Sequence, residues 1–314
     1  MEFVLSKKET VETNWDVIII GGGPGGLSAA LYAARGGLKT LVIEKNFNVG
    51  GNIALTSLVE DYLGIPSING EELTQQMRKH VEQFGVKILT GEEVVSTTFG
   101  SPHIVKTRNQ TFNAKILIIA TGTNPRKLNV EGENEYIGKG ISYCAVCDAP
   151  FFKDKTVAVI GGGNSAFDES LYLTKFVKKL ILIHRREEFR ADKILQDRLM
   201  KKENVEFLLN KVVQKIEKEN DEMVLTLFDK KKQSTTQLRV NGIFIYIGLI
   251  PNSHLFNVDK DDRGYIITNE HMETNVKNVF AVGDVRKSPL KQVITAVSDG
   301  AIAGHTAEEK IRYE

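Results

Sequence analysis

The chain has 314 residues, which at roughly 150 residues per domain suggests about two domains. Its 41 Lys and Arg residues balance 40 Asp and Glu residues, so neither a basic nucleic-acid-binding surface nor an acidic tail is indicated. Apolar runs stay shorter than the roughly 18 residues of a membrane span, and residues 1–16 are too polar for a signal peptide. We therefore expect a cytoplasmic protein, and the two cysteines exclude a secreted scaffold stapled by disulfides.

The first elements along the chain predict a strand–helix–strand unit. Residues 15–20 form a continuous apolar run that is typical of a buried parallel strand. The glycine-rich segment 21–26 follows, then a helical stretch over 27–37 and a second strand over 38–44. This order within about 30 residues is that of a βαβ unit.

The glycine-rich segment has the spacing Gly21-x-Gly23-x-x-Gly26. Such glycines permit a tight turn and bring the backbone close to a pyrophosphate at a helix N-terminus. Glu44 ends the second strand 23 residues after Gly21, where a carboxylate accepts hydrogen bonds from ribose hydroxyls. A dinucleotide site is favoured over a glycine-rich turn without a ligand.

The middle of the chain continues the same domain and then repeats its beginning. Helical spacing predicts an amphipathic helix over 71–84. Short alternating segments follow at 86–90, 93–99 and 103–107, and a buried strand comes next at 115–120. A new strand over 155–160 runs into a second glycine loop, a helix to about 177 and a strand over 180–184. The second loop begins 140 residues after the first, which indicates an internal duplication.

Two similar segments containing Pro and Asn, 121–125 and 249–252, follow the apolar strands 115–120 and 242–248. We interpret them as crossings between domains. The predicted fold is α/β, with two Rossmann-like three-layer dinucleotide-binding domains, the second inserted into the first. The predicted parts are 1–123 and 251–314 for FAD, and 124–250 for NADPH together with the cysteine pair.

The second loop, Gly161-x-Gly163-x-x-Ala166, differs from the first in the residue that ends its next strand. The position 23 residues after Gly161 is basic, and further cations come after it: His184, Arg185, Arg186 and Arg190. A carboxylate would repel a 2′-phosphate, whereas guanidinium groups bind it bidentately. The first loop therefore suits the plain ribose of FAD, and the second suits NADPH. The alternative for this cluster is a solvated, charged start of a helix.

Cys144 and Cys147 lie between the two glycine loops, in the sequence Cys-Ala-Val-Cys-Asp. Two intervening residues suit a disulfide at the start of a helix or turn, where a thiolate is favoured. Zinc needs four ligands, and no second cysteine pair or nearby histidine stands in the sequence. A flavin-coupled dithiol is favoured over inert thiols. Asp148 could carry a proton or act as an N-cap for the following segment.

The C-terminal part adds a second contact region for the flavin. Residues 279–284 form a strand that ends in Gly283-Asp284, and Asp284 is placed to accept hydrogen bonds from ribityl hydroxyls. Gln292 opens an apolar helix that extends to about Ile311. The N-terminus of that helix, directed at the flavin pyrimidine, would stabilise the anionic reduced ring.

With these motifs the chain resembles the low-molecular-weight thioredoxin reductases, which are FAD-dependent members of the pyridine nucleotide-disulfide oxidoreductases. The resemblance rests on GGGPGG (21–26), CAVCD (144–148), GGGNSA (161–166), HRREEFR (184–190) and NVFAVGD…KQVITA (278–296). It covers essentially the whole chain, in the order and spacing of the family. The family commonly has Gln at Asn52, Asn at Asp61, Arg at Lys291 and CDG at CDAP.

The resemblance implies roles for individual residues. Cys147 would face the flavin, Cys144 would exchange with a protein substrate, and Asp148 would be the acid–base group. FAD would contact Gly21, Gly23, Pro24, Gly26, Glu44, Lys45, Gly51, Asn52, Asp61, Val94, Thr121, Gly122, Gly283, Asp284, Lys291, Gln292 and Val293. NADPH would contact Gly161, Gly163, Asn164, Ser165, His184, Arg185, Arg186 and Arg190. A homodimer and a rotation of the NADPH domain are also implied.

The expected function is NADPH-dependent reduction of thioredoxin through FAD and the Cys144–Cys147 disulfide. Other acceptors stay open, such as a glutaredoxin-like protein or a peroxidase partner. A flavin-dependent dithiol oxidase is disfavoured because it needs no NADPH and hence no cationic cluster. A nucleotide-binding sensor without activity is disfavoured by the intact cysteine pair. Neither a nucleic acid nor a membrane is an expected partner.

Overall fold

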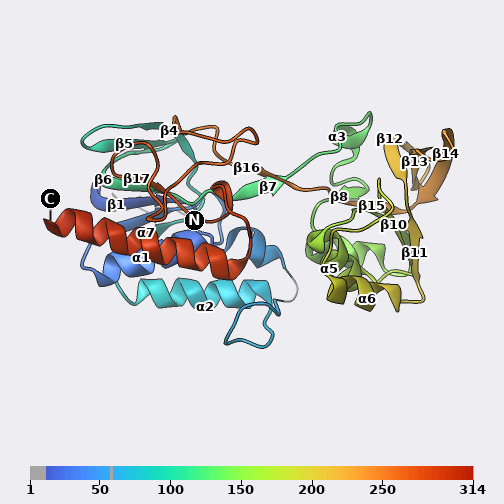
Figure 1. The fold of residues 1–314 in the computed structure, drawn as a ribbon, viewed down its shortest axis with the longest axis horizontal. Coiled ribbons are helices and arrows are strands. Elements are labelled where there is room, and N and C mark those ends of the chain that lie inside the picture. The colour runs from blue at the N-terminus through green and yellow to red at the C-terminus, as the bar shows by residue number, and fades with distance from the viewer. Residues whose placement is uncertain (1–11, 57–58, 314) are drawn as a thin grey trace, which may run out of the picture. The chain divides into compact units, whose positions relative to one another are not determined.

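The structure is a computed structural model that describes residues 12–56 and 59–313. The chain divides into two compact units (Figure 1). The first combines Met1–Thr123 with Pro251–Glu314, and the second is Asn124–Ile250. The two crossing segments, β7 (Thr123–Pro125) and β16 (Leu249–Pro251), pair with each other as a two-stranded sheet.

The first unit is built on one sheet in which β6 pairs with three neighbours. Its elements are β1 (Asn14–Ile20), α1 (Pro24–Arg35), β2 (Thr40–Ile43), a 3-10 turn (Gly51–Leu55), α2 (Gly70–Glu82), β3 (Lys87–Leu89), β4 (Val94–Thr98), β5 (His103–Thr107), β6 (Thr111–Ile119), β17 (Val279–Ala281), a 3-10 turn (Gly283–Val285) and α7 (Val293–Tyr313). The strand order is β3-β2-β1-β6-β5-β4, and β17 also pairs with β6. Strands β3, β2, β1, β6 and β17 are parallel, whereas β4 and β5 join as antiparallel strands.

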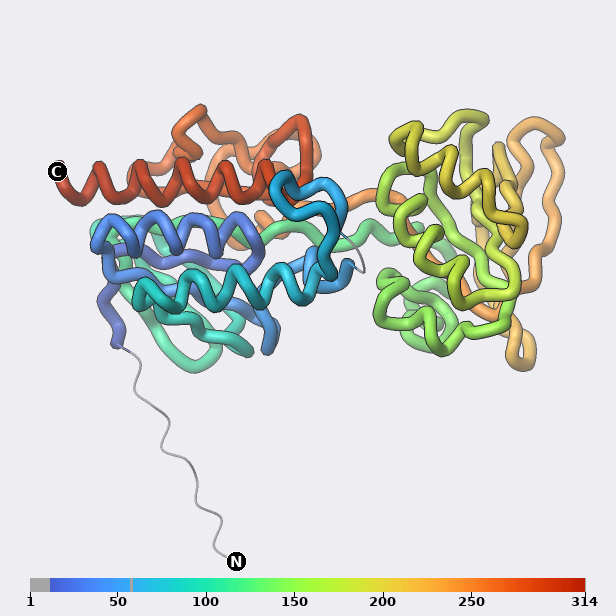
Figure 2. Tube along the Cα trace, turned by 90° about the horizontal axis from the view of Figure 1, so that it is seen from below, coloured from blue at the N-terminus to red at the C-terminus, as the bar shows by residue number. Residues whose placement is uncertain are grey.

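Three helices, α1, α2 and α7, lie side by side along one face of this sheet (Figure 2). Helices α1 and α7 approach closely because glycines stand at their contact: a Cβ on Gly300 would lie 2.2 Å from the Gly25 carbonyl oxygen. The opposite face is covered by apolar side chains such as Phe112, Phe256 and Ile266. The parallel strands, apolar on both faces, thus form the buried middle layer that the continuous apolar runs predict.

The second unit repeats this plan. Its elements are α3 (Glu133–Tyr136), β8 (Ile141–Ser142), α4 (Ala145–Asp148), a 3-10 turn (Ala149–Phe152), β9 (Thr156–Gly161), α5 (Asn164–Leu173), β10 (Lys179–Ile183), α6 (Lys193–Met200), β11 (Val205–Leu208), β12 (Lys211–Glu219), β13 (Glu222–Asp229), β14 (Ser234–Val240) and β15 (Gly242–Tyr246). The parallel sheet has the order β11-β10-β9-β15-β8. Helices α5 and α6 pack on one face, and the antiparallel sheet β12-β13-β14 packs on the other.

The two sheets share the order of their first four strands, so the duplication predicted from the glycine loops extends to the topology. The predicted fold class, two three-layer Rossmann-like domains with the second inserted into the first, is confirmed. Within residues 12–56 and 59–313, no helix combines the length and apolarity needed to cross a membrane.

Candidate active site

The first glycine loop connects β1 to α1 and uses its glycines for two different reasons. Gly21 has φ +111°, and a Cβ there would lie 2.3 Å from the Ala120 oxygen. A Cβ on Gly26 would lie 2.0 Å from the Gly21 oxygen, so both positions exclude a side chain for reasons of packing. Gly23 has φ −74°, and a Cβ there would meet no protein atom within 4 Å.

The open space beside Gly23 is what a phosphate-binding loop requires. The fold does not need a glycine at this position, because its backbone is extended and its surroundings are empty. A side chain here would instead occupy the space above the first turn of α1, where free N–H groups face a bound anion. Packing within the protein thus does not explain the glycine at position 23, whereas the space needed by a bound pyrophosphate does.

Glu44 holds the loop in place from the end of β2. The residue is 5% exposed, and its Oε2 accepts a hydrogen bond of 2.8 Å from the Gly22 N–H. Its Oε1 accepts one of 2.9 Å from the Asn46 N–H. Each carboxylate oxygen keeps a further lone pair, so the predicted contact with a ribose hydroxyl is compatible with both bonds.

Other residues expected at the flavin site differ in how their side chains are placed. The Gly50 N–H donates to the Gly22 oxygen at 2.8 Å, which brings the segment before Asn52 against the glycine loop. The Asn52 amide donates to the Thr123 backbone oxygen at 3.2 Å. Lys45 and Asp61 are exposed, whereas the Val94 side chain lies in the apolar core, which leaves only its backbone for a ligand. Their cofactor contacts stay predictions.

A second connection forms where the chain returns to the first unit. Thr121 Oγ1 donates to the Asn252 backbone oxygen at 2.7 Å, and the Asn252 side-chain amide donates to the Thr121 oxygen at 2.9 Å. The Asn252 N–H donates to the Gly122 oxygen at 3.0 Å. These bonds join the end of β6 to the segment that follows β16, beside the predicted contacts Thr121 and Gly122.

Asp284 lies half-buried after β17, and its carboxylate has no hydrogen bond or ion pair within the described part of the chain. Burial raises the pKa of Asp284, and the charge of Lys291 opposes that shift. The Lys291 ammonium donates to the Asp284 backbone oxygen at 2.8 Å and lies 4.0 Å from the Tyr265 ring centre. An acceptor left open in this way suits the hydroxyl ligand that the sequence predicts there.

Helix α7 begins next to Asp284, after the partly buried Gln292 and with Val293 buried at its first position. Sequence reasoning missed a buried ion pair behind this start. Asp299 Oδ2 lies 3.2 Å from Arg286 Nε and accepts a hydrogen bond of 3.1 Å from the Gly283 N–H. An aspartate inside an apolar helix was the available signal.

The second glycine loop repeats the same division of roles. A Cβ on Gly161 would lie 2.4 Å from the Tyr246 oxygen, and one on Gly162 would lie 2.3 Å from the His184 ring. A Cβ on Gly163 would meet no atom within 4 Å. Asn164 starts α5, and its side chain exchanges two hydrogen bonds of 2.8 Å with Asp192. Ser165 is exposed.

The cationic cluster follows β10 as an irregular segment, not as the start of a helix, since α6 begins at Lys193. His184 is 6% exposed, its Nε2 lies 3.1 Å from the Glu188 oxygen, and burial lowers its pKa. The other three members, Arg185, Arg186 and Arg190, are exposed. In the described residues, no carboxylate pairs with their guanidinium groups, so these groups fit an external phosphate.

Cys144 and Cys147 form a disulfide with a Cα–Cα distance of 5.4 Å. Cys144 is the N-cap of α4, and the Cys147 N–H donates to Cys144 Sγ at 3.2 Å. That contact favours negative charge on Cys144 Sγ once the disulfide opens. Cys147 is exposed and Cys144 partly buried, so exposure alone does not assign their roles. Asp148 makes no side-chain cap bond, which argues against the N-cap alternative.

Several residues that sequence reasoning missed hold the disulfide segment in position. The Tyr143 hydroxyl donates to Glu133 Oε1 at 2.6 Å, and Glu133 is fully buried. The Tyr246 hydroxyl accepts a hydrogen bond of 2.8 Å from the Ala145 N–H, between the two cysteines. Phe151, four residues after Cys147 in the sequence, is 72% exposed.

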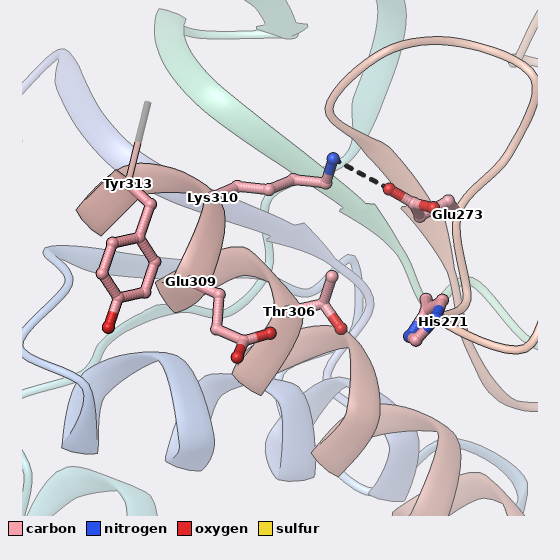
Figure 3. Close-up of a pocket in the computed structure, with 6 residues that line it drawn as sticks. All are labelled: His271, Glu273, Thr306, Glu309, Lys310 and Tyr313. Atoms are coloured by element: carbon pink, nitrogen blue, oxygen red, sulfur yellow. Dashed lines mark ion pairs between the residues drawn. The ribbon is translucent and has the colours of Figure 1, made fainter.

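A surface hollow in the first unit lies away from these groups. It is lined by His271, Glu273, Thr306, Glu309, Lys310 and Tyr313 (Figure 3). Lys310 pairs with Glu273 at 2.9 Å. The hollow lies at the C-terminal end of α7, whereas Asp284 and the glycine loop lie near the N-terminal end. In the part of the chain that the structure describes, no group of three or more His, Cys, Asp or Glu side chains could hold a metal.

Comparison with known proteins gives one consistent result. The model of the family described as pyridine nucleotide-disulphide oxidoreductase matches residues 15–300. The chain belongs to this family. A curated relative named thioredoxin reductase from Bacillus subtilis is 43% identical over 306 residues, which are 96% of both chains.

Solved structures of family members agree with this assignment. The thioredoxin reductase of Lactococcus lactis has a TM-score of 0.92 at 39% identity, over 96% of this chain and all of the other. The enzyme from T. acidophilum has a TM-score of 0.91 at 35% identity, with the same coverage. As a member of the pyridine nucleotide-disulphide oxidoreductases, the chain is expected to use a flavin and a nicotinamide cofactor, which agrees with its two glycine loops.

Proposed function

We propose that the chain is an FAD-containing enzyme that uses NADPH to reduce the disulfide of thioredoxin or of a thioredoxin-like protein. The Cys144–Cys147 disulfide is the observation that carries this proposal, because both cysteines of the chain are used in it and its segment packs against α5, the helix that follows the second glycine loop. Relatives at about 40% identity over nearly the whole chain are named thioredoxin reductase, which supports the same acceptor.

The two glycine loops support the choice of cofactors. Glu44 and the unpartnered carboxylate of Asp284 suit the hydroxyls of FAD in the first unit, and Arg185, Arg186 and Arg190 suit the 2′-phosphate of NADPH in the second. When bound, NADPH supplies a hydride and FAD passes two electrons to a disulfide. The open space at Gly23 and Gly163 gives each loop room for a pyrophosphate.

The cysteines then perform thiol–disulfide exchange. The Cys144 thiolate attacks one sulfur of the acceptor, a bond forms between them, and the other acceptor sulfur leaves and takes a proton. The Cys147 thiolate next attacks Cys144 Sγ, closes the disulfide and releases the second acceptor thiol. The Cys147 N–H stabilises charge on Cys144 Sγ, which supports Cys144 as the exchanging cysteine. Asp148 is the proposed proton carrier.

The test is NADPH consumption by the purified holoenzyme with candidate thioredoxins. Cys144→Ser and Cys147→Ser should each abolish reduction of thioredoxin and retain electron transfer to an artificial acceptor, because hydride transfer to the flavin involves no sulfur. Cys147→Ser should trap thioredoxin as a mixed disulfide, and Cys144→Ser should trap it poorly. Trapping by the Cys144→Ser variant instead would exchange the two roles, and thioredoxin reduction by both variants would reject the mechanism.

We also propose a homodimer, which the family resemblance implies, and a cytoplasmic location, which the sequence predicts. Sedimentation velocity of the holoenzyme should give a particle of two 35.0 kDa chains. A single-chain particle at micromolar concentration would reject the dimer.

A further inference from the structure

Glu169 is a buried carboxyl that the proposed reaction does not use. It stands on α5, and its Oε2 is buried without a hydrogen-bond partner among the described residues. The residue as a whole remains partly exposed, so the carboxyl can exchange a proton with solvent. An unpaired oxygen of this kind is costly to bury while it is charged.

The helix that carries this carboxyl packs against the segment of the redox disulfide. Helix α5 and the segment after Cys144 share one core, in which Ala145 and Ala149 pack with Ala166. Tyr246 connects the two, since its hydroxyl accepts the 2.8 Å hydrogen bond from the Ala145 N–H. The negative charges of Glu169 and Asp148 both raise the pKa of the Tyr246 hydroxyl, after the larger effect of burial.

We propose that Glu169 takes up a proton when the Cys144–Cys147 disulfide is reduced and releases it when the disulfide forms again. The inference rests on the proposed redox role of this disulfide. Two electrons and one proton, from the reduced flavin or from two external thiols that join as a disulfide, break the S–S bond and leave one sulfur as a thiol and the other as a thiolate. The new negative charge raises the proton affinity of the nearby carboxylate, which takes its proton from solvent.

The proton affinity of Glu169 already suits this exchange. Burial, and then the charge of the adjacent Asp168, raise the pKa of Glu169 to about 7. The carboxyl is therefore divided between its two states near neutral pH, where a small change of charge at the cysteines shifts the balance. Glu169 is a positioning residue for charge, because it acts through the field at the cysteines and touches no substrate.

The charged groups around Glu169 do not provide another explanation for its proton affinity. From α4 the nearest ionisable groups are Asp148 and the cysteines, and from β15 Tyr246. Strand β9 has no ionisable side chain. The other charged neighbours are Lys193, which pairs with Asp197, and Arg198 on α6, and Lys179 on β10, which pairs with Glu206.

The experiment measures the equilibrium between the Cys144–Cys147 pair and glutathione in the FAD-loaded protein between pH 5 and 9. Free thiols are alkylated and counted by mass spectrometry, without NADPH or thioredoxin. The wild-type equilibrium constant should show an inflection near pH 7, and each unit by which reduction raises the carboxyl pKa appears as a tenfold change across it. Glu169→Gln should lose the inflection.

Two further variants control the result. Glu169→Asp keeps a carboxyl and should keep an inflection, whereas Asp168→Asn removes a neighbouring charge and should move the inflection to lower pH. A Glu169→Gln profile identical to wild type would overturn the proposal. If that variant does not fold, an unmoved inflection in Asp168→Asn overturns it. Because no thioredoxin is present, failure of the proposed acceptor leaves this test intact.

Discussion

The two units end their second strands with opposite chemistry on the same framework. In the first, Glu44 accepts hydrogen bonds from the N–H groups of Gly22 and Asn46 and so holds the glycine loop through its charge. In the second, His184 packs its ring against the loop, where a Cβ on Gly162 would lie 2.3 Å from it. One unit fixes its loop with a carboxylate, and the other fixes it with a ring.

The difference changes what each site can bind. A carboxylate beside the loop accepts hydrogen bonds from ribose hydroxyls and repels a 2′-phosphate, which suits the plain ribose of a flavin nucleotide. Replacing it with an imidazole whose pKa is lowered by burial leaves that position without negative charge. The exposed guanidinium groups of Arg185, Arg186 and Arg190 can then determine the preference of the second site.

Removal of these cations should give the largest effect. We expect the double variant Arg185→Ala, Arg186→Ala to bind NADPH more than about a hundredfold more weakly, because two charge-assisted hydrogen bonds of about 1.5–3 kcal/mol each are lost. NADH affinity should change little. Steady-state kinetics with both cofactors measure the difference.

The matched control replaces two exposed lysines of the same unit, Lys201 and Lys202, with alanine. It should leave the ratio between the cofactors unchanged. Equal losses for NADPH and NADH in the arginine variant would contradict the assignment of these residues to the 2′-phosphate.

Substitution at the second glycine of each loop should separate the two sites. The Cβ that Gly23→Ala or Gly163→Ala adds would have no protein atom within 4 Å, so both variants should fold. The added methyl group should weaken the cofactor of its own unit by about 1–3 kcal/mol, roughly fivefold to 150-fold, through crowding against the phosphate. Flavin content and NADPH titration measure the two losses.

Gly26→Ala is the contrast for this pair, because its Cβ would lie 2.0 Å from the Gly21 oxygen and should destabilise the fold itself. If Gly23→Ala lost the flavin only together with its folded structure, the glycine would serve packing and the pyrophosphate assignment would fail.

The sequence predicts the features that depend on local signals. Continuous apolar runs placed β1, β6 and β9 to within a few residues, because parallel strands buried on both faces need such runs. Helix α1 begins at Pro24, whereas the sequence predicts a start at residue 27. The predicted start is late because the two glycines in the first turn have low helix propensity, but in the fold they allow close packing. The sheet β12-β13-β14 was not predicted, because its outer strands are largely polar and charged.

The candidate site divides in the same way. Spacing predicts Gly23, Glu44 and the cysteine pair as site residues, because each belongs to a pattern of fixed spacing along the chain; their roles stay predictions. The contact between Tyr246 and Ala145 joins residues 101 positions apart, and Glu169 reads as an ordinary residue of a helix. Their importance depends on which elements pack together, which periodicity does not specify.

A third prediction uses the helices that follow the two loops. Eight residues after the first glycine, the first unit has the fully buried Ala29 and the second has Glu169. Because the pKa of Glu169 is raised from 4.5 to about 7 in the fold, stability is fully present below about pH 4.5 and decreases as pH rises to about 7. Glu169→Gln should therefore stabilise the protein at pH 8 by about 1–2 kcal/mol, a discounted figure because the residue is partly exposed.

Urea unfolding at pH 5 and pH 8 measures this effect. The gain from Glu169→Gln should be smaller at pH 5, where the carboxyl is mostly neutral. Asp168→Asn serves as a control on the same helix: its stability should change less between pH 5 and pH 8 than that of the wild type, because the variant removes one of the two causes of the shift. A loss of stability at pH 8 in the Gln variant would show that the carboxylate has a partner.

The smallest effect should come from His184, and its sign is opposite. Burial lowers the pKa of His184 below 6.5, so the unfolded chain binds a proton more readily than the folded one. The resulting stability is fully present above pH 6.5 and is lost as pH falls through the folded pKa. His184→Asn should lose less stability than wild type between pH 7.5 and pH 5, measured by urea unfolding without nucleotide. His305→Asn, at a site 61% exposed, should keep the wild-type dependence. If His184→Asn also kept the wild-type dependence of stability on pH, the His184 ring would be solvated. His184 and Glu44 would then differ in shape and not in their effect on charge at the loop.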